Sequence, residues 1–211
     1  MLVATTRHFG LLWVGIETTT VVSAPLIYFH RHRRSLEATW KYLLICSVGI
    51  ALALIGNLLL DISMQSQGRL ATEMTISALL VNASAVPPGG FQAAFVFPVS
   101  GYGTKMGVAP MHTWLPDAHS EAPSLVSALL SGALLNCAFL GIFRAYEIAL
   151  AAGLEQFASN LLLFFGFFSM LVAALFIVPF CDFKRMLAYP RVEPLSLIPI
   201  LPFRRKSTSS I

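Results

Sequence analysis

The sequence predicts an all-α integral membrane protein of about five transmembrane helices, the third of them broken. Hydrophobic residues make up 56% of the 211 residues and charged residues only 11%, whereas about a quarter of the residues of a soluble domain are charged. Five apolar runs come close to the roughly 20 residues that a bilayer core requires; they cover residues 9–29, 42–62, 90–110, 124–146 and 157–180. The third run contains the segment GYGTKMGVAP, in which a lysine stands among helix-breaking residues.

The first run is expected to be a retained helix, because MLVATTRHFG has no basic region followed by a small-residue cleavage site. Basic residues then set the expected orientation. The loop RHRRSLEATWK after the first run and the segment CDFKR after the fifth run are rich in arginine and lysine. By the positive-inside rule both face the cytoplasm, which places the N-terminus outside and WLPDAHSEAPS inside.

Between the second and third runs, residues 75–86 are long enough for a short interfacial helix but not for a span. The third run is then the chemically interesting one. Pro110 lacks an N–H group and disturbs the helix about one turn earlier, while Gly103 and Gly107 permit local unwinding. A break beside Lys105 predicts a protein-lined or hydrated pocket, since free backbone groups are not tolerated in lipid. The alternative is a lysine that snorkels to the interface from near the helix end.

A charged side chain in a membrane helix costs roughly 2.5–3.5 kcal/mol on insertion scales, so Lys105 and Glu17, which stands within the first run, call for a functional explanation. Two interpretations of Glu17 are compatible. It is a proton-binding carboxyl, or its oxygens are satisfied by the hydroxyls of Thr18, Thr19 and Thr20. A carboxyl whose charge depends on the distance to a lysine is a switchable proton site.

Beyond the break, four titratable residues fall within ten positions: His112, Asp117, His119 and Glu121. Imidazoles and carboxylates at this density could relay protons. They could equally serve loop structure, because Asp117 is a good turn residue. A zinc site is disfavoured, since the two histidines do not have the i, i+4 spacing that places two ligands on one helix face.

The remaining composition indicates no cofactor and no nucleic-acid partner. Cys46, Cys137 and Cys181 are far apart and form no CxxC or Cys/His metal spacing, so we expect small reduced hydrophobes. The net charge of +4 comes from short membrane-flanking runs and the C-terminus, which is a pattern of topology rather than of a phosphate-binding face.

The segment GYGTKMGVAPMHTWLPDAHSEAPSLVSALLSGALLNCAFLGIFR resembles the seventh and eighth helices of the antiporter-like membrane subunits of complex I, Mrp antiporters and membrane-bound hydrogenases. Together with GIETTTVVSAPLIYFHRHRRSLEATWKYLLICSVGIALAL it is most similar to the branch of that family found in hydrogenase-4 and formate hydrogenlyase. The resemblance runs from about residue 9 to about residue 189. It implies a partial antiporter-like domain over residues 1–189 and a multi-pass location in a bacterial or archaeal cell membrane.

The resemblance also implies roles for single residues. Glu17 matches an essential glutamate and Lys105 the lysine of a broken helix, a charge pair whose separation is thought to drive lysine protonation. His112 and His119 match loop histidines of the proton path, and Asp117 and Glu121 would support them. Asn136 stands where quinone-reducing relatives carry a lysine, which puts that relay step in doubt and favours the hydrogenase branch.

The implied function is proton translocation by a membrane subunit that holds no redox centre and works with partner subunits of a respiratory or hydrogen-evolving complex. The alternatives are a Mrp-type sodium/proton antiporter subunit and a structural membrane fragment without transport. Residues 190–211, PRVEPLSLIPILPFRRKSTSSI, depart from the family; their prolines exclude a regular helix. We expect this tail to mark a truncated gene product that is inactive alone.

Overall fold

The computed structural model of the chain describes residues 2–65, 74–83 and 88–177. These residues are helical apart from loops and an isolated antiparallel bridge between His8 and Thr75, so the all-α prediction is confirmed. The elements are α1 (Leu2–Thr5), α2 (Phe9–Ile27), the 3₁₀-helix η1 (Tyr28–His30), α3 (Arg33–Gln65), α4 (Ile76–Asn82), α5 (Pro88–Met106), α6 (Trp114–Glu121), α7 (Ser124–Leu129), the π-helix η3 (Leu130–Leu134), α8 (Leu135–Ala151) and α9 (Glu155–Ile177).

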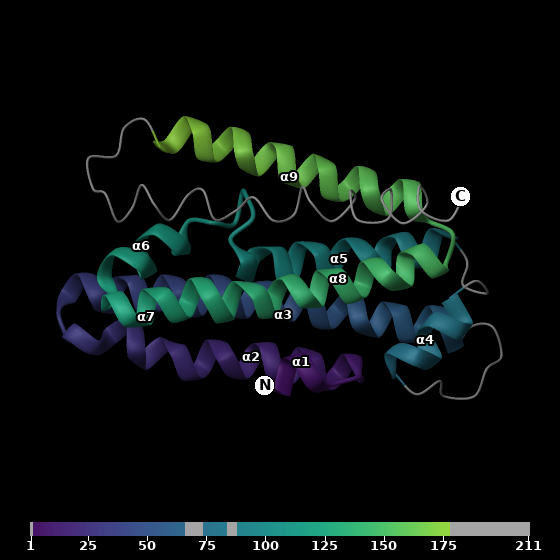
Figure 1. Cartoon of the computed structure of the whole chain (residues 1–211), viewed down its shortest axis with the longest axis horizontal. Helices are drawn as coiled ribbons and strands as arrows, with labels where there is room; N and C mark the ends of the chain where they lie inside the picture. The colour runs from purple at the N-terminus through teal and green to yellow at the C-terminus, as the bar shows by residue number, and fades with distance from the viewer. Residues whose placement is uncertain (1, 66–73, 84–87, 178–211) are drawn as a thin grey trace, which may run out of the picture.

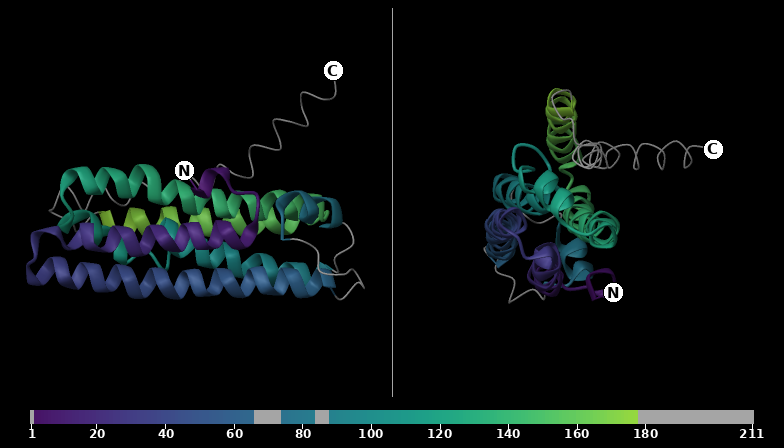
Figure 2. Two further views of the ribbon diagram at one scale, coloured as in Figure 1. Left: turned by 90° about the horizontal axis from the view of Figure 1, so that it is seen from below. Right: turned by 90° about the vertical axis from the view of Figure 1, so that its left-hand side faces the viewer.

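The long helices α2, α3, α5 and α8 run lengthwise beside one another and form the bundle (Figure 1). The short helices α6 and α7 lie at one end of this bundle and α4 lies at the other. Helix α9 packs along one flank and stands apart from the rest when the bundle is seen end-on (Figure 2). Its outer face carries exposed aromatic rings, such as Phe164 and Phe167, as expected for a helix that meets lipid or further helices.

Four helices of the described residues are long and apolar enough to cross a membrane: Phe9–His30, Arg33–Gln65, Ser124–Ala151 and Glu155–Leu175. The predicted third span also forms a helix, α5, but it is not among these four. Its sequence includes Gln92, Ser100, Thr104 and Lys105, and most of its C-terminal half is buried. A helix enclosed by its neighbours is solvated by protein and does not need the apolar surface of a lipid-facing helix.

The tightest packing is between α3 and α5, where small residues let the two backbones approach closely. A Cβ atom on Gly49 would lie only 2.6 Å from the Cβ atom of Thr104, and a Cβ atom on Gly56 would collide with the ring of Pro98. Small residues at a helix crossing are the usual means of association in a membrane, where apolar burial against lipid gains little.

The short helix expected within residues 75–86 is confirmed as α4. Cys46 is a buried free thiol and Cys137 a half-buried one. The predictions that concern Cys181, the basic segment CDFKR and residues 190–211 lie outside the described residues.

Candidate functional site

The predicted interruption after α5 is confirmed, and of the glycine and proline residues named from sequence it is Gly107 that ends the helix. Helix α5 ends at Met106 because Gly107 has a φ of +84°, a left-handed conformation that glycine adopts at little cost. The N–H of Gly107 donates to the carbonyl of Thr104 (3.1 Å), and that of Val108 donates to the carbonyl of Gly103 (2.8 Å). This pair of bonds is a Schellman cap, which ends the helix within its own backbone.

Lys105 lies in the last turn of α5 and is 0% exposed, so it does not snorkel to an interface. Its ammonium group points across the bundle to α2. There Nζ donates a hydrogen bond to the carbonyl oxygen of Ile16 (2.8 Å) and another to Oγ1 of Thr20. A cation at the C-terminal end of a helix is also favoured by the helix dipole. The lysine is therefore held by neutral oxygen atoms inside the protein.

Glu17 is half-buried rather than buried, which corrects the expectation from sequence. The hydroxyl of Thr20 donates to Oε2 of Glu17 (3.3 Å) while its oxygen accepts from Lys105. The contacts of these described residues include no direct Glu17–Lys105 ion pair, so one threonine hydroxyl joins the two charges. The hydroxyls of Thr18 and Thr19 donate instead to backbone carbonyls of α2, at Val14 and Ile16.

Two further residues beside this network were not predicted from sequence. Tyr42 of α3 is 0% exposed, and its hydroxyl oxygen lies 2.7 Å from Oγ of Ser23 on α2. Tyr42 also stacks at a tilt against Trp114, with ring centroids 5.0 Å apart. A tyrosine and a serine in apolar runs resemble ordinary packing residues, and only the placement of α3 against α2 reveals the contact.

Helix α6 is docked onto the end of α5 and carries one of the two predicted histidines. Nε1 of Trp114 donates to the carbonyl of Thr104 (2.9 Å), so the first residue of α6 completes the cap of α5. His119 is 4% exposed, and its Nδ1 atom lies 2.6 Å from Oγ of Ser127 on α7. His112 lies in the turn before α6 and is 8% exposed. Burial lowers the pKa of its imidazole, which favours the neutral form of the ring.

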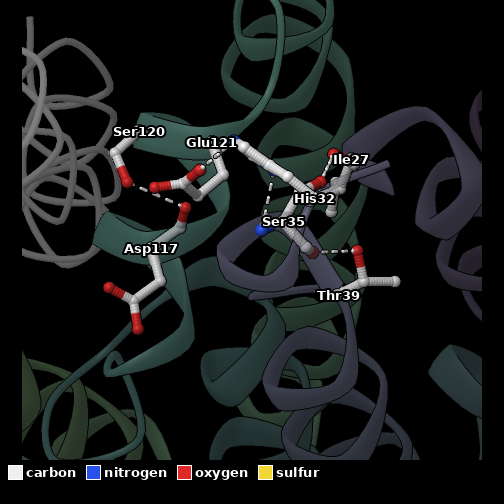
Figure 3. Close-up of polar contacts among 7 residues, drawn as sticks. All are labelled: Ile27, His32, Ser35, Thr39, Asp117, Ser120 and Glu121. Atoms are coloured by element: carbon white, nitrogen blue, oxygen red, sulfur yellow. Dashed lines mark hydrogen bonds and ion pairs between the residues drawn. The ribbon is translucent and has the colours of Figure 1, made fainter. Parts of the chain in front are cut away.

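On α6, Glu121 lies toward His32, which directly precedes α3 (Figure 3), and Asp117 lies within reach of Lys41 on α3. Nε2 of His32 lies 3.3 Å from Oε2 of Glu121, while Nδ1 of His32 accepts from the N–H of Ser35. The neutral tautomer with hydrogen on Nε2 satisfies both contacts. Lys41 contacts Oδ2 of Asp117 at 3.1 Å. Asp117 and Glu121 therefore hold α6 against the basic end of α3. The segments RHRRSLEATWK and WLPDAHSEAPS, which are expected on the same side of the membrane, do contact each other.

Arg34, Glu37, Lys41, Asp117 and Glu121 line a polar cleft of about 250 Å³ at this end of the bundle. A separate cavity of about 190 Å³ opens at the α5 break, lined mainly by α5, the turn that follows it and Phe165 of α9. Lys105 does not line this cavity. The pocket predicted at the break thus exists, but it lies away from the ammonium group.

Asn136, at the start of α8, is exposed on the surface of the described chain. Its side-chain amide donates to the carbonyl of Gly132 within η3 (2.6 Å). A π-helical turn inside a long helix often marks a functional position. The sequence LSGAL contains no signal for it, because each of these residues also fits an α-helix.

Comparison with known proteins supplies the family. The model of a family described as NADH:quinone oxidoreductase/Mrp antiporter, TM, matches residues 7–199. A hydrogenase-4 component F homolog of Methylacidiphilum infernorum is 40% identical over 194 residues, which cover 91% of this chain and 40% of the relative. NADH-quinone oxidoreductase subunit N of Deinococcus radiodurans is 33% identical over 200 residues, covering 91% of this chain and 38% of that subunit. The chain thus spans about two fifths of the length of these relatives.

Solved structures show the same fold. A chain of the membrane-bound sulfane sulfur reductase, an archaeal respiratory membrane complex, matches with a TM-score of 0.83 and 20% identity, over 94% of this chain and 39% of that one. A chain of respiratory complex I from Thermus thermophilus matches with a TM-score of 0.74 and 22% identity, over 92% and 40% of the two chains. The extent of the family match, taken with the membrane-spanning helices, identifies this chain as a multi-pass, antiporter-like membrane protein that belongs to the NADH:quinone oxidoreductase/Mrp antiporter transmembrane family.

Proposed function

We propose that this chain carries the Glu17–Lys105 charge pair of a proton-translocating membrane subunit, in a complex like hydrogenase-4, formate hydrogenlyase or NADH-quinone oxidoreductase. The observation that carries the proposal is the buried ammonium of Lys105, held against α2 at the end of a capped helix. A buried charge of this kind is expensive in a membrane protein and is characteristic of ion pathways.

The Thr20 hydroxyl connects the charge of Glu17 to that of Lys105. While Thr20 accepts from Lys105 and donates to Glu17, each charge stabilises the other through one intervening group. A movement of α2 relative to α5 would break this contact and leave the ammonium with fewer partners, which favours release of its proton. His112 and His119 supply exchangeable imidazoles on the α6 side, and Asp117 and Glu121 support that helix from its polar cleft.

The same contacts favour protons over sodium. A sodium ion is bound by oxygen atoms, and the two α2 oxygens at this site already accept hydrogen bonds from Lys105. A cation in their place would also be repelled by the ammonium. We therefore prefer proton translocation to sodium/proton exchange of the Mrp type. The chain carries no redox group in this proposal and is coupled to electron transfer by other membrane subunits of its complex.

The proposal is tested in a chimera in which residues 9–177 replace the matching helices of a full-length homologous subunit, assembled in its complex. Glu17→Gln and Lys105→Ala should each abolish proton pumping, measured with a pH-sensitive dye in vesicles, while assembly remains. Asp61→Asn is the matched control, since Asp61 contacts Gln65 of its own helix in an exposed pair. Wild-type pumping by either assembled variant would refute the assigned roles, and dependence of transport on sodium would favour the antiporter alternative.

A further inference from the structure

Asn57, near the middle of α3, is a buried polar residue that the charge pair does not use. Its side chain is 4% exposed, and neither the amide nitrogen nor the carbonyl oxygen has a hydrogen-bond partner in the described protein. Leaving such atoms without partners in the protein interior is unfavourable. Polar side chains in this position are therefore expected to bind something that the helices themselves do not supply.

A second polar group lies next to it. Tyr102 of α5 is 0% exposed, and its hydroxyl lies close to the Asn57 carboxamide. Among the described residues this hydroxyl makes no hydrogen bond of standard distance and angle. Tyr102 precedes Lys105 by three residues, which places the two on the same face of α5.

A small internal cavity of about 10 Å³ adjoins Asn57. That volume corresponds to about one water molecule. Ala94 and Pro98 of α5 also line it, and Pro98 has no N–H to donate to the carbonyl of Ala94, four residues earlier. The carbonyl of Ala94 therefore lacks its usual i→i−4 donor, and we take it as a further water acceptor beside the Asn57 amide and carbonyl. Two to four polar partners are what a buried water requires.

We propose that Asn57 builds an internal hydration site between α3, α5 and α8, which binds a single water molecule. The carbonyl of Ala94, which Pro98 leaves without its usual donor, is a further ligand of this water. If the proposed proton transfer holds, this water lies on the side of Lys105 that faces the N-terminus of α5, beyond Tyr102. The hydration site itself stands on the geometry of Asn57 and does not require that transfer.

X-ray radiolytic footprinting tests the site in the full chain reconstituted in lipid nanodiscs, because radicals formed from a bound water label adjacent buried rings. Tyr102 and Tyr42 are the matched reporters: both are 0% exposed, but the Tyr42 hydroxyl is satisfied by Ser23. We expect oxidation of Tyr102 to be at least about fivefold faster than that of Tyr42. Asn57→Leu should reduce it to the Tyr42 rate, and Asn57→Ser, which keeps a polar atom, should retain most of it.

Equal rates for Tyr102 and Tyr42 in the wild-type chain would overturn the proposal, as would unchanged Tyr102 labelling in a folded Asn57→Leu variant. Misfolding of Asn57→Leu would raise the labelling of both tyrosines together. In that case the proposal is decided by the ratio of Tyr102 to Tyr42 oxidation in the wild-type chain and in Asn57→Ser. Loss of proton pumping with labelling intact would refute the proposed function and leave the hydration site standing.

Discussion

At the scale of single residues, the site depends on a hydroxyl placed between two charges. Thr20 is the only side chain seen to contact both Lys105 and Glu17 among the described residues. It is 0% exposed, so water cannot replace it from the surface. The sequence shows three successive threonines and offers no means of choosing between them, since the choice is fixed by the rotation of α2 against α5.

Thr20→Val should therefore lower the free energy of unfolding by about 1.5–3 kcal/mol, the value of a hydrogen bond to a charged group. Valine keeps the shape of the side chain but cannot accept from the ammonium. The measurement is denaturant unfolding in mixed micelles. Thr18→Val is the control, because that exposed hydroxyl bonds to the carbonyl of Val14 in its own helix, and it should change stability by less than about 0.5 kcal/mol. Equal effects of the two substitutions would show that Thr20 does not hold the lysine.

The residues of the site that sequence predicted are those with an unusual chemical type for a membrane helix. Lys105 and the histidines His112 and His119 stand out by composition, and the structure does bury all three. Tyr42 and Asn57 do not stand out, because their positions follow from which faces of α2, α3 and α5 meet. Such long-range register has no local signature in a single sequence.

At the scale of elements, the end of α5 determines where the lysine lies. The Schellman cap at Gly107 stops the helix directly after the last turn, which contains Lys105. The interruption can be located from sequence because glycine and proline cluster there, but the sequence does not tell which of Gly103, Gly107 and Pro110 ends the helix. The decisive property is a positive φ angle at Gly107, which a pattern of residue types indicates only indirectly.

Gly107→Ala should accordingly cost about 1–2 kcal/mol, the penalty of a left-handed conformation for a residue with a Cβ atom. The new Cβ atom would also lie 3.0 Å from Cδ2 of Leu115 on α6. Thermal unfolding in detergent measures the change. Gly89→Ala, in the first turn of α5, is the control, since its Cβ atom would meet nothing within 4 Å. A chain in which both variants are equally stable would contradict the role assigned to the cap.

At the scale of the whole molecule, the contacts of Glu121 with His32 and of Asp117 with Lys41 bring the basic loop after α2 and the polar segment after α5 to one end of the bundle. The positive-inside rule predicts that this end faces the cytoplasm and that the N-terminus lies outside. A protease-sensitive tag at the N-terminus should thus be cleaved in intact spheroplasts, whereas a tag inserted beside His30 should be cleaved only after lysis. The reverse pattern would overturn the orientation.

This chain by itself should conduct no protons. A path through about 30 Å of hydrocarbon needs a continuous series of hydrated or titratable groups. No Asp, Glu, Lys, Arg or His stands between Val126 and Phe143 or between Phe157 and Phe180. Liposomes that contain the purified chain should therefore dissipate an imposed pH gradient no faster than empty ones, as followed by an internal dye. A leak that disappears in Lys105→Ala would contradict this expectation.

The π-helical turn η3 has a geometric consequence for the span Ser124–Ala151. One extra residue in an α-helix rotates everything that follows by about 100°, because each residue advances the helix by 1/3.6 of a turn. The faces of the helix before and after Leu130–Leu134 are therefore rotated relative to each other about the helix axis. A cysteine scan of accessibility along it should show a 3.6-residue rhythm before the turn and the same rhythm, displaced in phase, after it. Deletion of Gly132 should bring the two rhythms into register and turn Asn136 onto a different face.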